Sequence, residues 1–206
     1  MTLAQQMTQE GTGQQRRLVL ASASPRRQEL LREAGYEFSV FPANIDEDSY
    51  LTLMPIELAR HLSFEKAKAV ASRFPHDVIL AADTVVAFGD RALSKPEDAD
   101  DARKMLTLLS GTTHIVITGV TIMQKESEVQ QTRAVMSAVR MRALTPAEID
   151  AYIASGQWEG KAGGYGIQDQ DPFVTKMSGS HTNIVGLPME LVEKMLAELN
   201  IVPARG

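Results

Sequence analysis

The chain has 206 residues, 44% of them hydrophobic, which is typical of a soluble globular protein with one domain or two small lobes. No apolar run approaches the roughly 18 residues of a membrane span, and a formal net charge of -5 argues against binding nucleic-acid polymers through bulk charge. The absence of cysteine excludes disulfides, thiolate metal sites and cysteine nucleophiles, and it is compatible with a reducing compartment.

The first 15 residues are polar and contain no apolar core, so they do not resemble a signal peptide. We expect them to form a flexible leader. Residues 16–206 contain neither an internal repeat nor a long linker, and we expect them to form one domain.

A short apolar run and a helix start follow each other closely in residues 18–27. Leu18 to Ala21 predicts a buried strand, Ser24 can cap a helix, and Pro25 suits the first helical position. Arg26 and Arg27 then fall in the first turn, where cations oppose the helix dipole. They indicate either an anion site, most simply for phosphate, or two solvated surface arginines.

A strand is predicted over residues 37–41, and three consecutive carboxylates, Asp46, Glu47 and Asp48, follow it. They fit either a solvated acidic loop or part of a ligand set for a hard divalent cation, which prefers oxygen donors.

A long helix is predicted from Pro55 to about Phe74. Lys66 lies on its apolar stripe, which repeats every four residues. Its ammonium either reaches the edge of the protein surface or enters a cleft.

The clearest strand signal covers residues 77–88, where Asp83 stands within an apolar run. A carboxylate there must be paired, bound to metal or exposed at a strand end. We expect an active-site aspartate at the carboxyl end of the strand, with a buried structural aspartate as the alternative.

Further elements follow in the second half of the chain. Lys95 precedes a helix that ends at Gly111, residues 113–123 and 129–141 predict a hairpin, and Thr145 begins a helix with a capping box. The small-residue segment 161–168 is either a plain loop or a place where backbone approaches a ligand. The last helix is expected from Pro188 to Leu199.

Alternating helices and strands, together with the hairpin, predict an α/β fold with a mixed sheet. The clustered cations and carboxylates, without a Ser-His-Asp pattern, favour metal-assisted phosphate chemistry. The sequence has neither a Walker P-loop nor a Rossmann fingerprint.

Seven short motifs in register resemble those of the Maf-like nucleotide pyrophosphatases, and they cover about Leu18 to Leu199. The motifs are Ala21-Ser-Ala-Ser-Pro-Arg-Arg27, Ile45-Asp-Glu47, Glu65-Lys-Ala67, Ala82-Asp-Thr84, Ser94-Lys-Pro96, Lys161-Ala-Gly-Gly-Tyr-Gly-Ile-Gln168 and Asn183-Ile-Val-Gly-Leu-Pro188. The resemblance implies an elongated, inosine-triphosphatase-like fold with a mixed sheet flanked by helices and a cleft between two lobes. It also implies a cytoplasmic, commonly homodimeric enzyme that splits a nucleoside triphosphate into a monophosphate and pyrophosphate.

The resemblance also implies roles for individual residues. Asp83 resembles the proton acceptor that activates water, and Glu47, with Asp83, resembles the metal site for Mg or Mn. The triphosphate-binding groups are matched by four residues: Ser22, Arg27, Lys66 and Lys95.

Base preference in the family is set at positions matched here by Arg26, Thr84 and Gln168. These identities resemble the branch that acts on dTTP and UTP, rather than the branch that acts on 7-methyl-GTP. Gly164 replaces the usual alanine and is expected to loosen the loop that carries Gln168. A rival hypothesis is a non-enzymatic role in septum formation through a protein partner.

Overall fold

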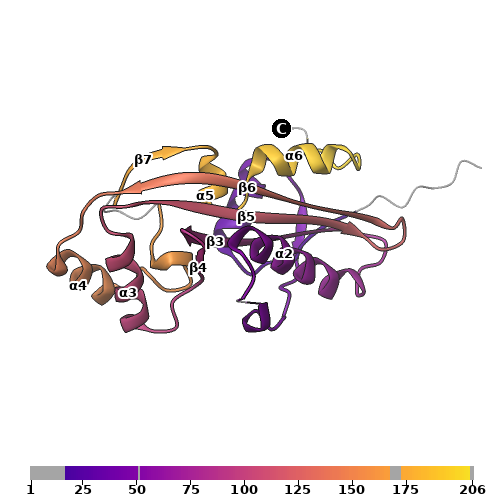
Figure 1. The fold of residues 1–206 in the computed structure, drawn as a ribbon. Coiled ribbons are helices and arrows are strands. Elements are labelled where there is room, and N and C mark those ends of the chain that lie inside the picture. The colour runs from indigo at the N-terminus through magenta and orange to yellow at the C-terminus, as the bar shows by residue number, and fades with distance from the viewer. Residues whose placement is uncertain (1–16, 51, 168–172, 205–206) are drawn as a thin grey trace, which may run out of the picture.

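A seven-stranded mixed sheet runs the length of the computed structural model, which describes residues 17–50, 52–167 and 173–204 (Figure 1). The strands are β1 (Leu18–Leu20), β2 (Phe38–Val40), β3 (Val78–Phe88), β4 (Arg91–Leu93), β5 (Thr113–Gln124), β6 (Val129–Met141) and β7 (Val174–Ser178). The helices are α1 (Pro25–Glu33), α2 (Pro55–Ala71), α3 (Ala99–Leu109), α4 (Pro146–Ala154), α5 (His181–Val185) and α6 (Met189–Ala197). Two short 3₁₀ turns are η1 (Asp48–Tyr50) and η2 (Ala162–Gly164). The predicted α/β class is confirmed.

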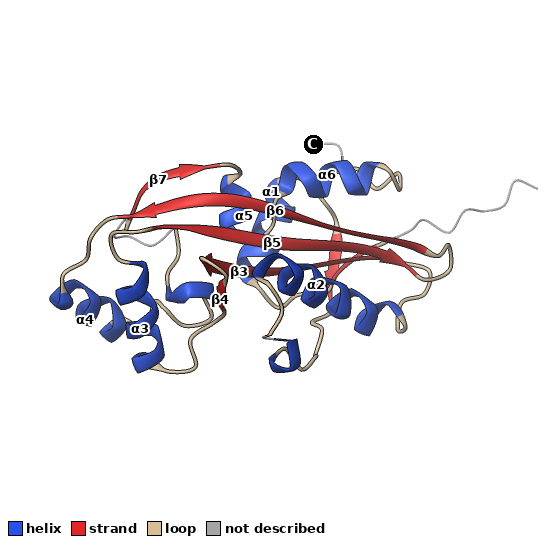
Figure 2. Cartoon of the chain, in the orientation of Figure 1, coloured by secondary structure: helices blue, strands red, loops and turns tan. Residues whose placement is uncertain are grey.

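The sheet has the strand order β2-β1-β3-β5-β6-β7, and β4 pairs with the end of β3. The pairs of β1 with β2 and β3 are parallel, while the remaining pairs are antiparallel. The long β5–β6 hairpin spans the molecule, with α2 and α6 on opposite sides of the sheet and α3 and α4 gathered at one end (Figure 2). This arrangement gives the elongated shape that the family resemblance implies.

Successive residues of β3 face opposite sides of the sheet, as the period of two requires. Leu80 and Ala82 belong to the core that includes side chains of α1 and α6. Ile79 and Ala81 belong to the core formed with α2. Continuing the alternation, Asp83 faces α2.

One edge of β3 is open at its centre. β1 pairs with residues 78–80 and β4 pairs with residues 86–88, while β5 occupies the opposite edge along residues 79–87. Residues 81–85 therefore have no described strand beside them on the β1 side. The gap gives other segments and a ligand access to the middle of the strand.

The expectation that Asp83 stands at the carboxyl end of its strand is wrong. Asp83 lies at the middle of the 11-residue strand β3, paired in register with Gly119 of β5. Asp83 nevertheless borders the gap along β3, because β1 pairs only with residues 78–80 and ends before reaching it.

Two predicted helix starts have different outcomes. Thr145 and Glu148 form the reciprocal capping box expected for α4. Ser24 occupies the cap position of α1 but makes no side-chain capping bond; its backbone N–H instead donates to Ser22 Oγ at 3.3 Å.

The proposed leader, residues 1–15, lies outside the described residues. Among the residues that are described, no helix combines the length and apolar character needed to cross a bilayer.

Candidate active site

A cavity of about 590 Å³ opens at the gap along β3. Its walls come from the β1–α1 turn, the middle of β3, the segment before α3, the loop at 159–167 and the end of α5. Eight of the nine residues assigned to the site from the sequence line it: Ser22, Arg26, Arg27, Glu47, Lys66, Asp83, Thr84 and Lys95. The ninth, Gln168, lies outside the described residues.

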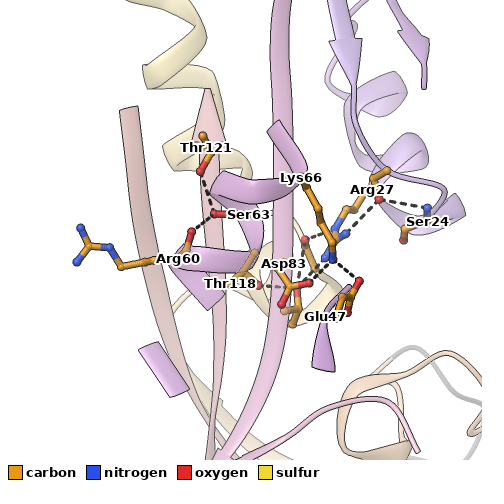
Figure 3. A network of polar contacts seen from close by, with 12 residues as sticks. Ser24, Arg27, Glu47, Arg60, Ser63, Lys66, Asp83, Thr118 and Thr121 are labelled. Atoms are coloured by element: carbon orange, nitrogen blue, oxygen red, sulfur yellow. Dashed lines mark hydrogen bonds and ion pairs between the residues drawn. The ribbon is translucent and has the colours of Figure 1, made fainter. Parts of the chain in front are cut away.

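Lys66 joins two carboxylates at the α2 side of the cavity (Figure 3). Its Nζ lies 2.5 Å from Asp83 Oδ1 and 2.8 Å from Glu47 Oε1. Lys66 is 8% exposed and Asp83 is 6% exposed, so the cation and carboxylate are largely shielded from water. Of the two hypotheses for Lys66, the structure therefore confirms entry into a cleft.

Glu47 belongs to the loop before η1 and is only half-buried. Burial would raise the pKa of its carboxyl, but attraction to Lys66, the hydrogen bond from Lys66 and the charges of Lys95 and Arg27 outweigh burial and lower it. Glu47 is therefore anionic at neutral pH. Its neighbour Asp46 instead accepts a hydrogen bond from Ser49 Oγ at 2.7 Å and does not line the cavity.

Arg27 is held on the other side of β3. Its Nη1 donates to Ser22 Oγ and its Nη2 donates to Thr84 Oγ1, both at 3.1 Å. Its Nε donates to the Gly186 carbonyl at 2.8 Å. Burial lowers the pKa of Arg27, and the charge of Asp83 partly offsets that effect. Arg27 is thus an oriented cation in the cavity wall rather than a solvated surface side chain.

The position of these two cations follows from the alternation along β3. Asp83 faces α2 and meets Lys66, whereas Thr84 faces the opposite side and meets Arg27. Because the edge of β3 is open here, both pairs also border the same cavity. Consecutive residues of one strand thereby bring cations from two helices to one site.

The segment 159–167 contributes residues that the sequence assigned no role. Glu159, Lys161 and Tyr165 line the cavity. The N–H of Gly163 donates to the Ser94 carbonyl at 3.0 Å, which holds this segment beside the one carrying Lys95. Its small residues were a signal for close approach, but the partner segment could not be read from the sequence.

Gly186 was also missed as a functional position. Its carbonyl accepts from Arg27, and its φ of +125° is in the region that favours glycine. The Asn183–Pro188 motif contains this glycine, although nothing in the motif indicates that the backbone carbonyl holds an arginine.

The site could hold a divalent cation with help from a substrate. Glu47 and Asp83 both contact the Lys66 ammonium and both line the cavity, and two carboxylates together with phosphate oxygens are a ligand set that suits Mg²⁺. Within the described ranges, no cluster of three or more acidic, histidine or cysteine side chains has metal-binding geometry. The residues present therefore fit a metal shared with phosphate better than a metal enclosed by protein alone.

Comparison with known proteins identifies the family of this chain. The family model described as "Maf-like protein" matches residues 17–199. A dTTP/UTP pyrophosphatase of Rhizobium johnstonii is 49% identical over 181 residues, covering 84% of this chain and 87% of that protein. The proteins of the same name from Brucella abortus and Syntrophus aciditrophicus are 46% and 41% identical and cover 89% and 92% of this chain, and 92% and 93% of their own lengths.

A solved structure of a HAM1 protein from Coxiella burnetii superposes with a TM-score of 0.52 at 17% identity, covering 89% of this chain and 99% of that one. This likeness concerns the fold alone, and it agrees with the mixed sheet flanked by helices that the family resemblance implies. The match over residues 17–199 and the identities above 40% establish the family: this chain belongs to the Maf-like proteins.

Proposed function

We propose that the protein hydrolyses dTTP and UTP to the nucleoside monophosphate and pyrophosphate. The observation that carries this proposal is the grouping of Asp83, Lys66 and Glu47 opposite Arg27 in one cavity. A triphosphate needs cations to neutralise its charge and a base to activate the attacking water, and this grouping contains both. The names of the relatives support the choice of nucleotides.

Asp83 is the proposed general base. A carboxylate can accept a proton from a water molecule placed for attack on the α-phosphate. The water's oxygen then forms the new bond to phosphorus as the bond to the bridging oxygen breaks, and pyrophosphate leaves. Lys66 lies against Asp83 and is positioned to orient its carboxylate.

Arg27, Lys66 and Lys95 are the proposed triphosphate-binding cations, with Ser22 supporting Arg27. They come from α1, α2 and the segment before α3, so they surround the cavity rather than forming one patch. The guanidinium of Arg27 has five N–H donors, and its contacts with described residues use three of them. The other two can bind phosphate oxygens.

Glu47 and Asp83 would hold a divalent cation, for which Mg²⁺ or Mn²⁺ suits the oxygen donors. When bound, such an ion neutralises phosphate charge and polarises the phosphoryl group. Lys66 already partly balances the two carboxylates, which keeps them close together before any ligand enters.

Base choice is assigned to Arg26, Thr84 and Gln168 by resemblance. Arg26 lines the cavity and can donate to a pyrimidine carbonyl. The hydroxyl of Thr84 already contacts Arg27, so we propose that its effect on substrate choice passes through that arginine.

The family resemblance further suggests a homodimer, which analytical ultracentrifugation would measure directly. The rival roles, septum regulation through protein contacts and cleavage of 7-methyl-GTP, have less support. The relatives cited above are named for dTTP and UTP, and the proposed base and cations are all present in the chain.

The proposal is tested by incubating the purified protein and Mg²⁺ with dTTP, UTP, CTP, GTP and 7-methyl-GTP and identifying the products by phosphorus NMR. We expect dTMP or UMP with pyrophosphate, and roughly 10- to 100-fold slower cleavage of CTP, because one unpaired polar group in the pocket costs about 1–3 kcal/mol. Preference for another nucleotide would refute the substrate assignment, and inorganic phosphate with a diphosphate would refute the cleavage site.

A further inference from the structure

A chain of hydroxyl groups on one face of the sheet connects Arg27 to the backbone of α5. Arg27 Nη2 contacts Thr84 Oγ1 at 3.1 Å, and Thr84 Oγ1 lies 2.9 Å from Thr118 Oγ1. Thr118 Oγ1 in turn donates to the backbone carbonyl of Asn183 at 3.0 Å. We infer that Thr118 is a positioning residue that orients Arg27 for phosphate binding through Thr84, an inference that rests on the proposed function.

The two ends of this chain of hydrogen bonds fix which hydroxyl donates at each step. A guanidinium can only donate, so Thr84 Oγ1 accepts from Arg27. At the other end, the carbonyl of Asn183 can only accept, so the single hydroxyl proton of Thr118 points to it. Thr84 must therefore donate its own proton to Thr118. This sequence of donors leaves a lone pair of Thr84 aimed at Arg27.

The end of the chain is anchored by a buried side chain. Asn183 is 0% exposed, and its Nδ2 donates to the Val116 carbonyl at 3.0 Å and to Ser137 Oγ at 2.9 Å. These contacts fix the turn of α5 that presents the Asn183 carbonyl. Gly186, which caps the same helix, accepts from Arg27 Nε. The guanidinium is thus positioned against α5 in two ways: directly through the Gly186 carbonyl, and through the two threonine hydroxyls that end at the Asn183 carbonyl.

Thr118 has no contact of its own with the cavity. It is 0% exposed and does not line the cavity, whereas its cross-strand neighbour Thr84 does. If Thr118 lost its hydroxyl, Thr84 could still donate to the Gly186 carbonyl at 3.5 Å, its other hydrogen-bond acceptor among the described residues. Turning toward it changes the direction of the lone pairs offered to Arg27. Small misplacements of a binding group are costly to a reaction that depends on alignment.

The chain offers a matched control on the same strand. Thr121 is also a 0% exposed threonine of β5, and its Oγ1 has hydroxyl partners at 2.9 Å in Ser63 and Thr132. Neither partner contacts Arg27. Thr121→Val therefore deletes a buried, hydrogen-bonded hydroxyl without altering the chain to the cavity.

The first arm of the test is a double-mutant cycle on kcat/KM for dTTP. We expect Thr118→Val to lower kcat/KM about 10-fold, equivalent to about 1.4 kcal/mol, and Thr118→Ser to restore most of it. In an Arg27→Lys background, Thr118→Val should change kcat/KM less than about 2-fold, because its effect passes through the guanidinium. Thr121→Val should leave activity near wild type. Equal losses in both backgrounds would overturn the inference. If Thr118→Val does not fold, Thr118→Cys takes its place, since a thiol is only a weak hydrogen-bonding group.

The second arm does not depend on turnover. The Nε–H resonance of Arg27, assigned by its loss in Arg27→Lys, reports the environment of the guanidinium in nitrogen-15 NMR. We expect this signal to shift in Thr118→Val and to stay in place in Thr121→Val. An unchanged signal in Thr118→Val would overturn the positioning role. A wild type that cleaves no nucleotide would refute the proposed function alone, because this arm still decides whether Thr118 orients Arg27.

Discussion

The ammonium of Lys66 lies 2.5 Å from the carboxylate of Asp83, and the two side chains come from α2 and β3. The contact ties the helix to the centre of the sheet at the proposed catalytic base. Because both groups are largely buried, each depends on the other to offset the loss of hydration.

Lys66→Met should therefore destabilise the protein as well as inactivate it. Removing one partner of a buried pair leaves an uncompensated charge, here beside a second carboxylate, Glu47. Because the cavity admits water, we expect the free energy of unfolding to fall by about 2 kcal/mol, less than for a fully enclosed pair. Urea denaturation would measure the loss.

Lys68→Met is the control, since Lys68 is exposed on the same helix and pairs with Glu65. Adding Asp83→Asn to Lys66→Met should recover part of the lost stability by removing one of the two repelling charges. If the double variant recovered no stability, the loss in Lys66→Met would not come from repulsion between the two carboxylates.

Lys95→Ala should weaken catalysis equally on dTTP and UTP, because phosphate groups carry no base identity. Loss of a charge-assisted hydrogen bond is worth about 1.5–3 kcal/mol, so kcat/KM should fall by roughly 10- to 100-fold on each nucleotide. Lys104→Ala, on the exposed face of α3, should have little effect. A Lys95 variant that changed only the ratio between the nucleotides would instead indicate base recognition.

His114 should make stability depend on pH. It is 2% exposed, its Nε2 lies 2.5 Å from the Tyr165 hydroxyl, and burial lowers its pKa to about 4. Between that value and its unfolded pKa of about 6.5, the unfolded chain binds more protons. The contribution of His114 to the free energy of unfolding is therefore fully present above pH 6.5. It is lost as the pH falls toward 4, by roughly 3 kcal/mol at most.

His114→Gln removes this ionisable group while keeping a polar partner for Tyr165. Urea denaturation at several pH values should give a shallower dependence for the variant than for the wild type across this window. The lowered pKa of Glu47 acts in the same direction at lower pH but is retained in both proteins. Parallel plots of stability against pH for the two proteins would show that His114 does not cause the pH dependence.

Gly119→Ala should disturb the packing of α2. A Cβ on Gly119 would lie 2.1 Å from the carbonyl oxygen of Ala59, a backbone atom that cannot move without the helix. Overpacking of this kind costs about 1–3 kcal/mol. Because α2 carries Lys66, we expect a lower thermal midpoint together with lower activity. An unchanged thermal midpoint and unchanged activity would show that the packing of α2 does not depend on this glycine.

The sequence predicted most of the helices and strands but not β4, β7 or α5, and the family resemblance assigned the residues that line the cavity. The four-residue stripe of α2 placed Lys66 on a buried face, and the carboxylate within an apolar strand marked Asp83 as requiring a partner. Neither pattern specifies which partner a residue meets. That depends on the open edge of β3, which exists because β1 is short and β4 pairs only with residues 86–88.

Other contacts have no local signal at all. Thr118 is one threonine within an apolar strand, and its role becomes visible only when its register opposite Thr84 is known. The close packing of α2 on Gly119 and the hydrogen bond that Arg27 Nε donates to the Gly186 carbonyl likewise involve backbone atoms of distant segments. The pattern of apolar residues along a sequence indicates which side chains are buried. These contacts depend instead on how helices and strands are placed relative to one another.

The central claim, that Asp83 activates water for attack on the α-phosphate, is tested most directly by turnover of dTTP in oxygen-18 water. We expect the label to enter dTMP and not pyrophosphate, and we expect Asp83→Asn to remain folded while kcat falls by about 10²- to 10⁴-fold. Label in pyrophosphate, or near wild-type turnover by the folded variant, would contradict it.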